Sequence, residues 1–185
     1  AGTVMERYRD KVKYWMTFNE INHCKADSEL GMWLAGGIRC EAGERAEQVC
    51  AQAVHHMFVA SARAVRRGKE INPEFQIGCM IGYIPYYPLS CDPKDVFATE
   101  ERGREDYFFS DVMVKGAYPY YKKKQYEKQG ILLETEKTDE EELRQGTVDY
   151  IGFSYYMSNV YCADESKLTA TSGGIIRTVK NPYLQ

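Results

Sequence analysis

Hydrophobic and polar positions in this chain follow two alternating patterns, one typical of strands and one typical of helices. A β-branched and aromatic run over Val12–Phe18 predicts the first strand, and similar runs predict strands at 76–81 and 148–155. The third run is apolar at both alternating sets of positions, which predicts a strand buried on both faces. Strands separated by helical stretches are typical of βα units and a parallel sheet.

Four helices are predicted around these strands. The longest covers 46–67 and stops near Gly68, and its apolar stripe of mostly small residues predicts close packing against a sheet. That stripe consists of Val49, Ala53, Met57, Ala60 and Ala64. The other helices cover 94–115, weakened near Gly103, then 120–129 with a stop at Gly130, and a short one that starts with a Thr138–Glu141 capping box and ends near Gly146.

Two connections after predicted strands are long enough to form the walls of a site. Residues 21–45 follow the first strand without clear periodicity, and GYIPYYPLSCDP follows the second. Loops of this length in compact domains are usually functional or disordered, and their position at strand ends favours a cleft wall. After Tyr161 the chain is rich in Ser, Thr and Gly and shows little periodicity.

Three parallel strands with long connections do not make a common stable domain. A complete (β/α)8 barrel takes about 250 residues, whereas this chain has 185. The predicted fold class is therefore α/β, a portion of a (β/α)8 TIM barrel of about three βα units. We expect residues 1–185 to be the central part of one such domain, with the N-terminal and C-terminal barrel units outside this chain.

Composition excludes several other classes of protein. A hydrophobic content of 44% with 28% charged residues is typical of a globular chain, and the net charge of −3 gives no basic field for nucleic acid. No apolar run approaches the roughly 18 residues of a membrane-spanning helix, and the N-terminus does not have the pattern of a signal peptide. We expect a cytoplasmic protein with no membrane or nucleic-acid partner.

Cysteine and histidine positions do not indicate a metal site. The six cysteines are scattered without a CxxC pair, so we expect reduced thiols that behave as small buried hydrophobes. His55 and His56 lie in mid-helix with no Cys or carboxylate four residues away, which favours packed or exposed rings over metal ligands. We therefore predict no metal and no cofactor.

The first predicted strand ends abruptly at Asn19 and Glu20. A desolvated carboxylate is costly unless it is paired or used, and in parallel barrels the carboxyl ends of strands carry the chemistry. Glu20 is therefore interpreted as a catalytic carboxylate. The alternative is an ordinary Glu that caps the next segment or lies exposed on a loop.

Four collinear motifs between about 12 and 161 identify a family resemblance. YWMTFNEIN resembles the acid/base strand of glycoside hydrolase family 1, and HHMFVASARAV resembles the helix after it. IPYYP and VDYIGFSYYMS resemble the segment after strand five and the sixth strand. The resemblance implies strands four to six of the (β/α)8 barrel of a retaining β-glycosidase.

The resemblance also implies roles for three residues. Glu20 matches the general acid/base, Asn19 the residue that binds the sugar 2-hydroxyl, and Tyr156 the residue that contacts the nucleophile carboxylate. Ile21 stands where the family usually has Pro, and Ser154 where it has Asn. Both departures resemble the cytoplasmic 6-phospho-β-glucosidase branch, so the implied substrate is a 6-phospho-β-glucoside.

Two family motifs do not occur in this sequence. There is no E-N-G nucleophile motif and no Ser-x-Lys-x-Tyr segment for a 6-phosphate, and neither Glu44 nor Glu134 has the strand context of a nucleophile. The chain is expected to carry the acid/base half of the site and to show no turnover alone. Alternatives are an enzyme for unphosphorylated β-glucosides or β-galactosides, a non-catalytic carbohydrate-binding barrel, and an inactive excised segment. A homo-oligomer is possible.

Overall fold

Three parallel strands form the central sheet of the computed structural model, which describes residues 1–170 and 177–181. They are β1 (Tyr14–Met16), β2 (Gln76–Tyr83) and β4 (Tyr150–Tyr155), in the order β1-β2-β4. Both neighbouring pairs are parallel, with Tyr14 opposite Gln76 and Gly78 opposite Tyr150. The alternation of strands and helices read from the sequence therefore does correspond to a parallel sheet.

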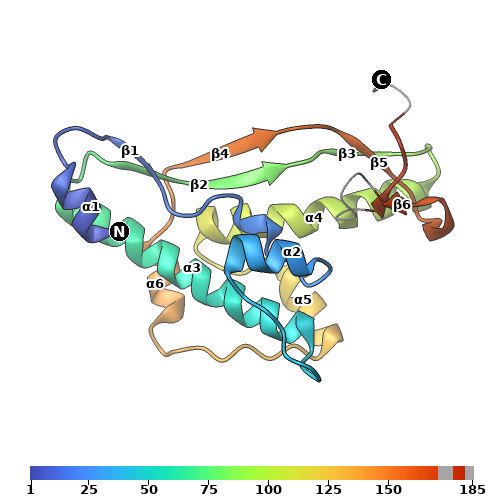
Figure 1. Ribbon diagram of the computed structural model, residues 1–185, viewed down its shortest axis with the longest axis horizontal. Helices are drawn as coiled ribbons and strands as arrows, with labels where there is room; N and C mark the ends of the chain where they lie inside the picture. Colours follow the sequence, from blue (N-terminus) through green and yellow to red (C-terminus); the bar gives the residue numbers. More distant parts are fainter. Residues whose placement is uncertain (171–176, 182–185) are drawn as a thin grey trace.

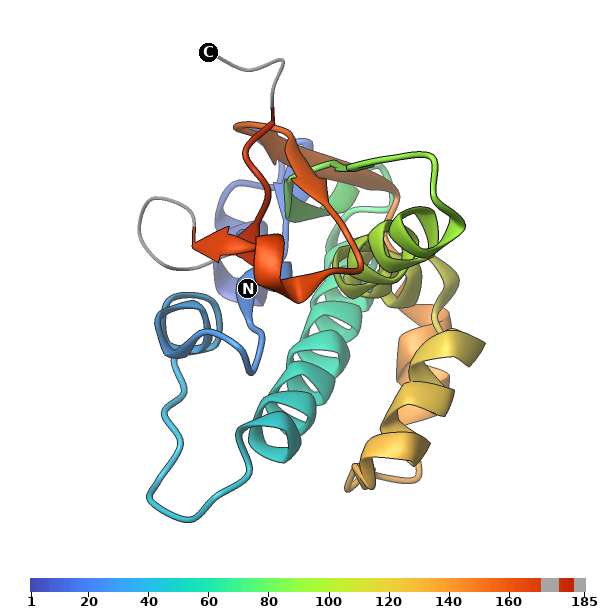
Figure 2. The same cartoon turned by 90° about the vertical axis from the view of Figure 1, so that its right-hand side faces the viewer.

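Two long helices form a layer beneath the sheet, as Figures 1 and 2 show. They are α3 (Ala46–Ile71) and α4 (Pro93–Lys115), and α4 runs continuously through Gly103, where the sequence predicted a weak point. The short α1 (Gly2–Arg7) packs on α3, as does α6 (Asp139–Gln145). Helix α5 (Tyr120–Gln129) ends at Gly130, as predicted.

Short helices and strands form in the connecting segments for which the sequence pattern predicted no helix or strand. The segment 21–45 contains three helical turns, and the Pro/Tyr segment contains a strand that pairs in parallel with the chain after β4. The last described residues form a small antiparallel pair, and part of the Ser/Thr/Gly-rich segment lies outside the described residues. These elements are η1 (Ile21–His23), α2 (Glu29–Gly31), η2 (Met32–Gly36), β3 (Tyr86–Pro88), β5 (Asn159–Tyr161), η3 (Glu165–Lys167), β6 (Thr169–Ala170) and β7 (Arg177–Thr178).

The predicted boundaries of the first strand and the longest helix were wrong. β1 is only three residues long, because the chain before it is still turning: the Val12 amide donates to the Tyr8 carbonyl. α3 continues past Gly68 to Ile71. Gly68 acts as a packing residue and not as a stop, since an added Cβ there would lie 2.3 Å from Cδ1 of Ile77.

The face of α3 that is buried also differs from the prediction: the buried positions lie about one residue along the helix from the predicted stripe. All five residues predicted for the stripe are only partly buried or exposed. Residues one position along are buried instead, among them the large apolar side chain of Phe58, whose burial stabilises the fold. The buried positions include Cys50, Val54, Phe58, Ser61 and Val65.

Strand β4 is not buried on both faces, contrary to the prediction. Its exposed residues are Ile151, Phe153 and Tyr155, and Phe153 retains 61% of its accessible surface. The register places Ile151 opposite Cys79, so this face is the one that the helices cover at β2. β4 has a strand on one side only, and the helix layer leaves its outer positions open.

The start of α6 depends on buried hydrogen-bonding contacts of Asp139 and not on the predicted capping box. Thr138 is the N-cap residue but its side chain makes no capping hydrogen bond. Buried Asp139 instead accepts from the Glu136 amide and lies 3.0 Å from Nε2 of buried His55, whose Nδ1 lies 3.1 Å from the Tyr118 hydroxyl. Burial acts to raise the pKa of Asp139, but these partners outweigh it and hold that pKa below its usual value. This contact attaches α6 to α3.

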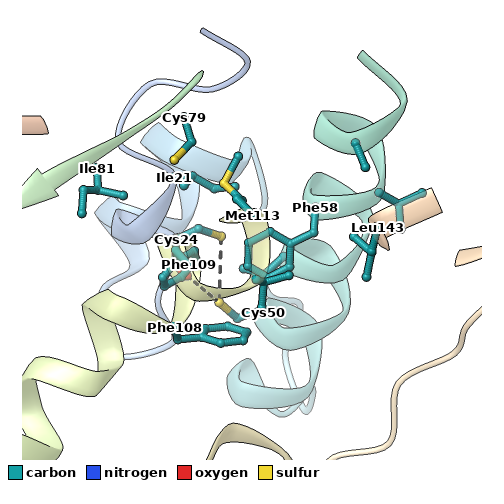
Figure 3. Packing of buried hydrophobic residues seen from close by; sticks show 14 of the residues in the cluster. Ile21, Cys24, Cys50, Phe58, Cys79, Ile81, Phe108, Phe109, Met113 and Leu143 are labelled. Atoms are coloured by element: carbon teal, nitrogen blue, oxygen red, sulfur yellow. Dashed lines mark hydrogen bonds between the residues drawn. The ribbon is translucent and has the colours of Figure 1, made fainter. Parts of the chain in front are cut away.

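The main hydrophobic core lies between the sheet and the helix layer. Figure 3 shows side chains from β2, α3 and α4 meeting around Phe58. Its ring packs edge-on against Phe108, with the ring centroids 5.4 Å apart. Ile21 and Cys24, from the segment that follows β1, belong to the same cluster. The core therefore includes the chain that directly follows Glu20.

The contact between α6 and α3 predicts a large effect at one glycine. A Cβ at Gly146 would lie 2.4 Å from the Cα and carbonyl oxygen of Ala62, and backbone cannot move aside as a side chain can. Gly146→Ala is expected to lower the free energy of unfolding of the intact protein by roughly 1–3 kcal/mol, measured in urea.

Gly103→Ala is the matched control. It lies in mid-helix, and an added Cβ would meet only the movable ring of Tyr107, at 3.3 Å. Because Ala is favoured over Gly in a helix by about 1 kcal/mol, stability should stay the same or rise. Equal losses at both glycines would contradict the packing argument.

Candidate active site

Glu20 lies just beyond the carboxyl end of β1 in a strained backbone conformation. Its φ of 46° and ψ of 46° are left-handed, and no other non-glycine residue among those described has a positive φ. This conformation costs roughly 1–2 kcal/mol for a residue with a side chain. The turn is closed by the amide of His23, which donates to the Glu20 carbonyl at 3.0 Å. Such strain is typical of functional sites.

Two side chains hold the Glu20 carboxylate, whose exposed fraction is 17%. The Tyr156 hydroxyl donates to Oε1 at 3.1 Å, and Nε2 of His23 lies 3.3 Å from Oε2. Tyr156 directly follows β4, so the contact joins the carboxyl ends of the two outer strands across β2. Two residues that the sequence analysis selected, 136 positions apart, are thus brought together.

Asn19, the third predicted residue, is exposed next to Glu20 at the same edge of the sheet. Tyr156 retains 65% of its accessible surface, so the site is open on this side. The predicted partner of Tyr156 is a nucleophile carboxylate, whereas here its hydroxyl contacts the proposed acid/base. The roles of all three residues therefore stay predictions.

Asn22 is a site residue that the sequence analysis missed. It is fully buried, and its amide group satisfies both backbone groups of Gly82: Nδ2 donates to the carbonyl and Oδ1 accepts from the amide, each at 2.8 Å. Nδ2 also donates to Asp106 on α4 at 2.8 Å, and Asp106 accepts from Lys25 at 2.5 Å. The turn that carries Glu20 is thereby attached to β2 and α4.

His23 was missed as well. Side chains three residues apart eclipse each other in a 3₁₀ turn, which returns His23 to the side of Glu20. Its ring occupies the space beside Gly82, where an added Cβ would lie 2.4 Å from Nε2. The spacing Glu-x-x-His was the available signal, but it becomes meaningful only once the 3₁₀ turn η1 is known.

A charged cluster lies beside this turn at the end of β2. The Arg102 guanidinium stacks over the Tyr86 ring at 5.4 Å and lies 3.8 Å from Asp27. Burial raises the pKa of Tyr86 by more than the nearby Arg102 lowers it. The phenol therefore stays neutral at ordinary pH. Tyr86 comes from the Pro/Tyr segment and Asp27 from residues 21–45. Both connections expected to form walls thus come together near His23.

The burial of the cysteines departs in part from expectation. Cys24, Cys50, Cys79 and Cys162 are buried, but Cys40 is half-buried and Cys91 is exposed. Among residues 1–170 and 177–181, no three His, Cys, Asp or Glu side chains gather as metal ligands. In the same ranges no helix has the length and apolar character needed to cross a membrane.

Comparison with known proteins fixes the family. The sequence profile of glycosyl hydrolase family 1 matches residues 1–185. The chain belongs to this family. The resemblance read from the four motifs is thereby confirmed.

Several similar curated proteins are named as phospho-glucosidases. The chain is 48% identical over 188 residues to aryl-phospho-beta-D-glucosidase BglA of Bacillus subtilis (strain 168), covering 100% of this chain and 39% of that protein. It is 44% identical to a 6-phospho-beta-glucosidase of Clostridium longisporum and 40% identical to 6-phospho-beta-glucosidase AscB of Escherichia coli (strain K12). These two matches cover 99% and 100% of this chain and 38% of each relative. The chain thus spans about two fifths of the relatives it matches.

Solved structures confirm the fold class. The chain matches a family 1 β-glucosidase from Thermotoga maritima with a TM-score of 0.69 at 20% identity, covering 100% of this chain and 38% of that one. A β-glucosidase from Exiguobacterium marinum gives a TM-score of 0.68 at 20% identity, with 100% and 40% covered. The described residues do not close a barrel, so the structure is a portion of a (β/α)8 barrel, as predicted.

The Asn22 contacts predict a stability effect that its neighbour should not share. Asn22→Ala leaves the buried amide and carbonyl of Gly82 without their side-chain partner and should lower the free energy of unfolding by roughly 1–3 kcal/mol. Asn19→Ala changes the same residue type at an exposed position and should stay within about 0.5 kcal/mol of the parent. Urea denaturation of the intact protein measures both. A similar loss for both variants would refute the role given to Asn22.

Proposed function

We propose that this chain forms the acid/base half of the active site of a retaining β-glycosidase that cleaves 6-phospho-β-glucosides. The observation that carries the proposal is the strained Glu20 at a strand end, with Tyr156 and His23 within 3.3 Å of its carboxylate. Family membership supports β-glycoside hydrolysis, and the names of the similar proteins support a phosphorylated sugar.

In this proposal Glu20 acts twice. It first protonates the glycosidic oxygen while a second carboxylate attacks the anomeric carbon, and then removes a proton from the water that releases the sugar. Retaining enzymes place the two carboxyl groups about 5–5.5 Å apart. No E-N-G motif occurs in these 185 residues, so we assign the second carboxylate to a part of the protein outside this chain.

Residues near Glu20 would bind the substrate and orient the second carboxylate. Asn19 would bind the sugar 2-hydroxyl, with a hydrogen bond that strengthens as positive charge develops on the ring. The Tyr156 hydroxyl, which donates to Glu20 in this chain, would also contact the second carboxylate and orient it. Ile21 is fully buried in the core, so it would influence the site through packing and not through contact with substrate.

Replacing Glu20 tests the acid/base role. In the full-length protein, Glu20→Gln should lower kcat/KM for a 6-phospho-β-glucoside with a poor leaving group by about 10²–10⁴, the usual contribution of general acid–base catalysis. Activated aryl glycosides leave without protonation, so they should still release a rapid burst of phenol. Glu44→Gln alters a loop glutamate whose side chain accepts a hydrogen bond from the nearby Glu41 amide, and it should retain the parental rate. Normal turnover of the poor substrate by Glu20→Gln would remove Glu20 from the mechanism.

Substrate class is tested with a matched pair of aryl β-glucosides, one carrying a 6-phosphate and one without it. A site that pairs with the phosphate should favour the phosphorylated compound in kcat/KM by on the order of 100-fold or more. Equal or reversed rates would support the alternative of an enzyme for unphosphorylated β-glucosides or β-galactosides. Binding of both compounds without hydrolysis would support a non-catalytic carbohydrate-binding barrel.

A further inference from the structure

Two buried cysteines meet in the core directly behind the candidate active site. The sulfurs of Cys24 and Cys50 are 3.9 Å apart, and the Cys50 thiol lies 3.2 Å from the Cys24 carbonyl oxygen (Figure 3). Cys24 follows Glu20 by four residues in the same turn, whereas Cys50 lies near the start of α3. The pair therefore connects the segment that carries the catalytic carboxylate to the helix layer.

The pKa values of the two thiols are shifted in opposite directions. The hydrogen bond with Cys50 lowers the pKa of Cys24, and burial only partly opposes this. The same hydrogen bond and burial raise the pKa of Cys50. A thiol that ionises more easily beside one that keeps its proton is the arrangement of an attacking and a resolving cysteine. Cys79, in the same core, differs: burial raises its pKa to about 11.

A cavity gives small molecules access to the pair. Its volume is about 270 Å³, and both cysteines lie in its wall together with Lys25, Arg102 and Lys122. A space of this size holds several water molecules, at about 30 Å³ each, and therefore a molecule as small as a peroxide. Lys122 acts to lower the pKa of Cys50, but burial and the hydrogen bond with Cys24 outweigh it.

We propose that Cys24 and Cys50 form a reversible disulfide when the protein meets a peroxide. The Cys24 thiolate attacks one oxygen of hydrogen peroxide, which breaks the O–O bond, leaves a sulfenic acid and releases hydroxide. The Cys50 thiol then attacks the sulfenic sulfur and expels water. In total, two thiols and one peroxide give one disulfide and two waters, with both sulfurs oxidised and the peroxide reduced.

Formation of this bond has a consequence for the turn. A disulfide needs the sulfurs about 2.05 Å apart, so the pair must close by roughly 1.9 Å. Cys50 is fixed in a long helix, whereas Cys24 lies in a non-helical segment two residues after Asn22. The displacement therefore falls on the segment that positions Glu20, and oxidation is expected to lower turnover. This activity effect rests on the proposed function, whereas the disulfide itself does not.

Peptide mapping of the full-length protein tests the disulfide directly. The reduced protein is treated with hydrogen peroxide, its free thiols are alkylated, and its peptides are analysed by mass spectrometry with and without dithiothreitol. The expected product is a peptide pair joined through Cys24 and Cys50 that separates on reduction. Cys91, which is exposed, should be recovered alkylated or singly oxidised. Peroxide that oxidises Cys91 without producing the Cys24–Cys50 pair would overturn the proposal.

Activity of matched variants tests the consequence. Peroxide should lower the hydrolysis rate of the parent about 10-fold or more, since misplacing a catalytic group by about 1 Å can cost 100-fold, and dithiothreitol should restore it. Cys24→Ala lacks the thiol that attacks the peroxide and should keep its rate in peroxide. If this variant does not fold, Cys50→Ala should yield no disulfide-linked peptide pair in the mapping experiment. Cys91→Ala should respond like the parent. Equal loss in Cys24→Ala would show that oxidation acts elsewhere, and mapping identifies the bond even if no substrate is turned over.

Discussion

The candidate site depends on the burial of the two residues that follow Glu20. A left-handed backbone conformation is unfavourable for glutamate. The next two residues, Ile21 and Asn22, are both fully buried, and their contacts fix the direction of the chain after Glu20. Ile21 fills space in the main core, and the Asn22 amide completes the hydrogen bonding of Gly82. The free energy of these contacts offsets the backbone strain. Buried residues thus fix the backbone turn that carries Glu20 at the strand end.

The same arrangement couples three layers of the structure. Asn22 contacts β2 and, through Asp106, helix α4, while Cys24 contacts α3. Each contact fixes the turn from a different direction. Movement of β2, α3 or α4 would therefore displace the turn that carries Glu20. This is the physical reason to expect oxidation of the cysteines to affect turnover.

Both faces of the sheet leave apolar side chains exposed in this chain. Tyr14 and Met16 are exposed on β1, and Phe153 is exposed on β4. An exposed apolar patch usually marks a surface that another part of a protein or a partner covers. A barrel of eight strands would cover the inner face with further strands and the outer positions of β4 with a helix. The open surfaces agree with a chain that spans about two fifths of its relatives.

The sequence by itself determined the strand and helix types, the parallel sheet, the family and the choice of Glu20, Asn19 and Tyr156. The elements and the sheet follow from side-chain periodicity, and Glu20 follows from its place at a strand end. The family, Asn19 and Tyr156 follow from the resemblance that four motifs carry. Only the tertiary structure brought Tyr156 to Glu20, because that contact joins strands that are not neighbours in the sheet. It also decided the roles of Asn22, His23 and the cysteine pair, since their partners lie in other elements and no local pattern encodes them.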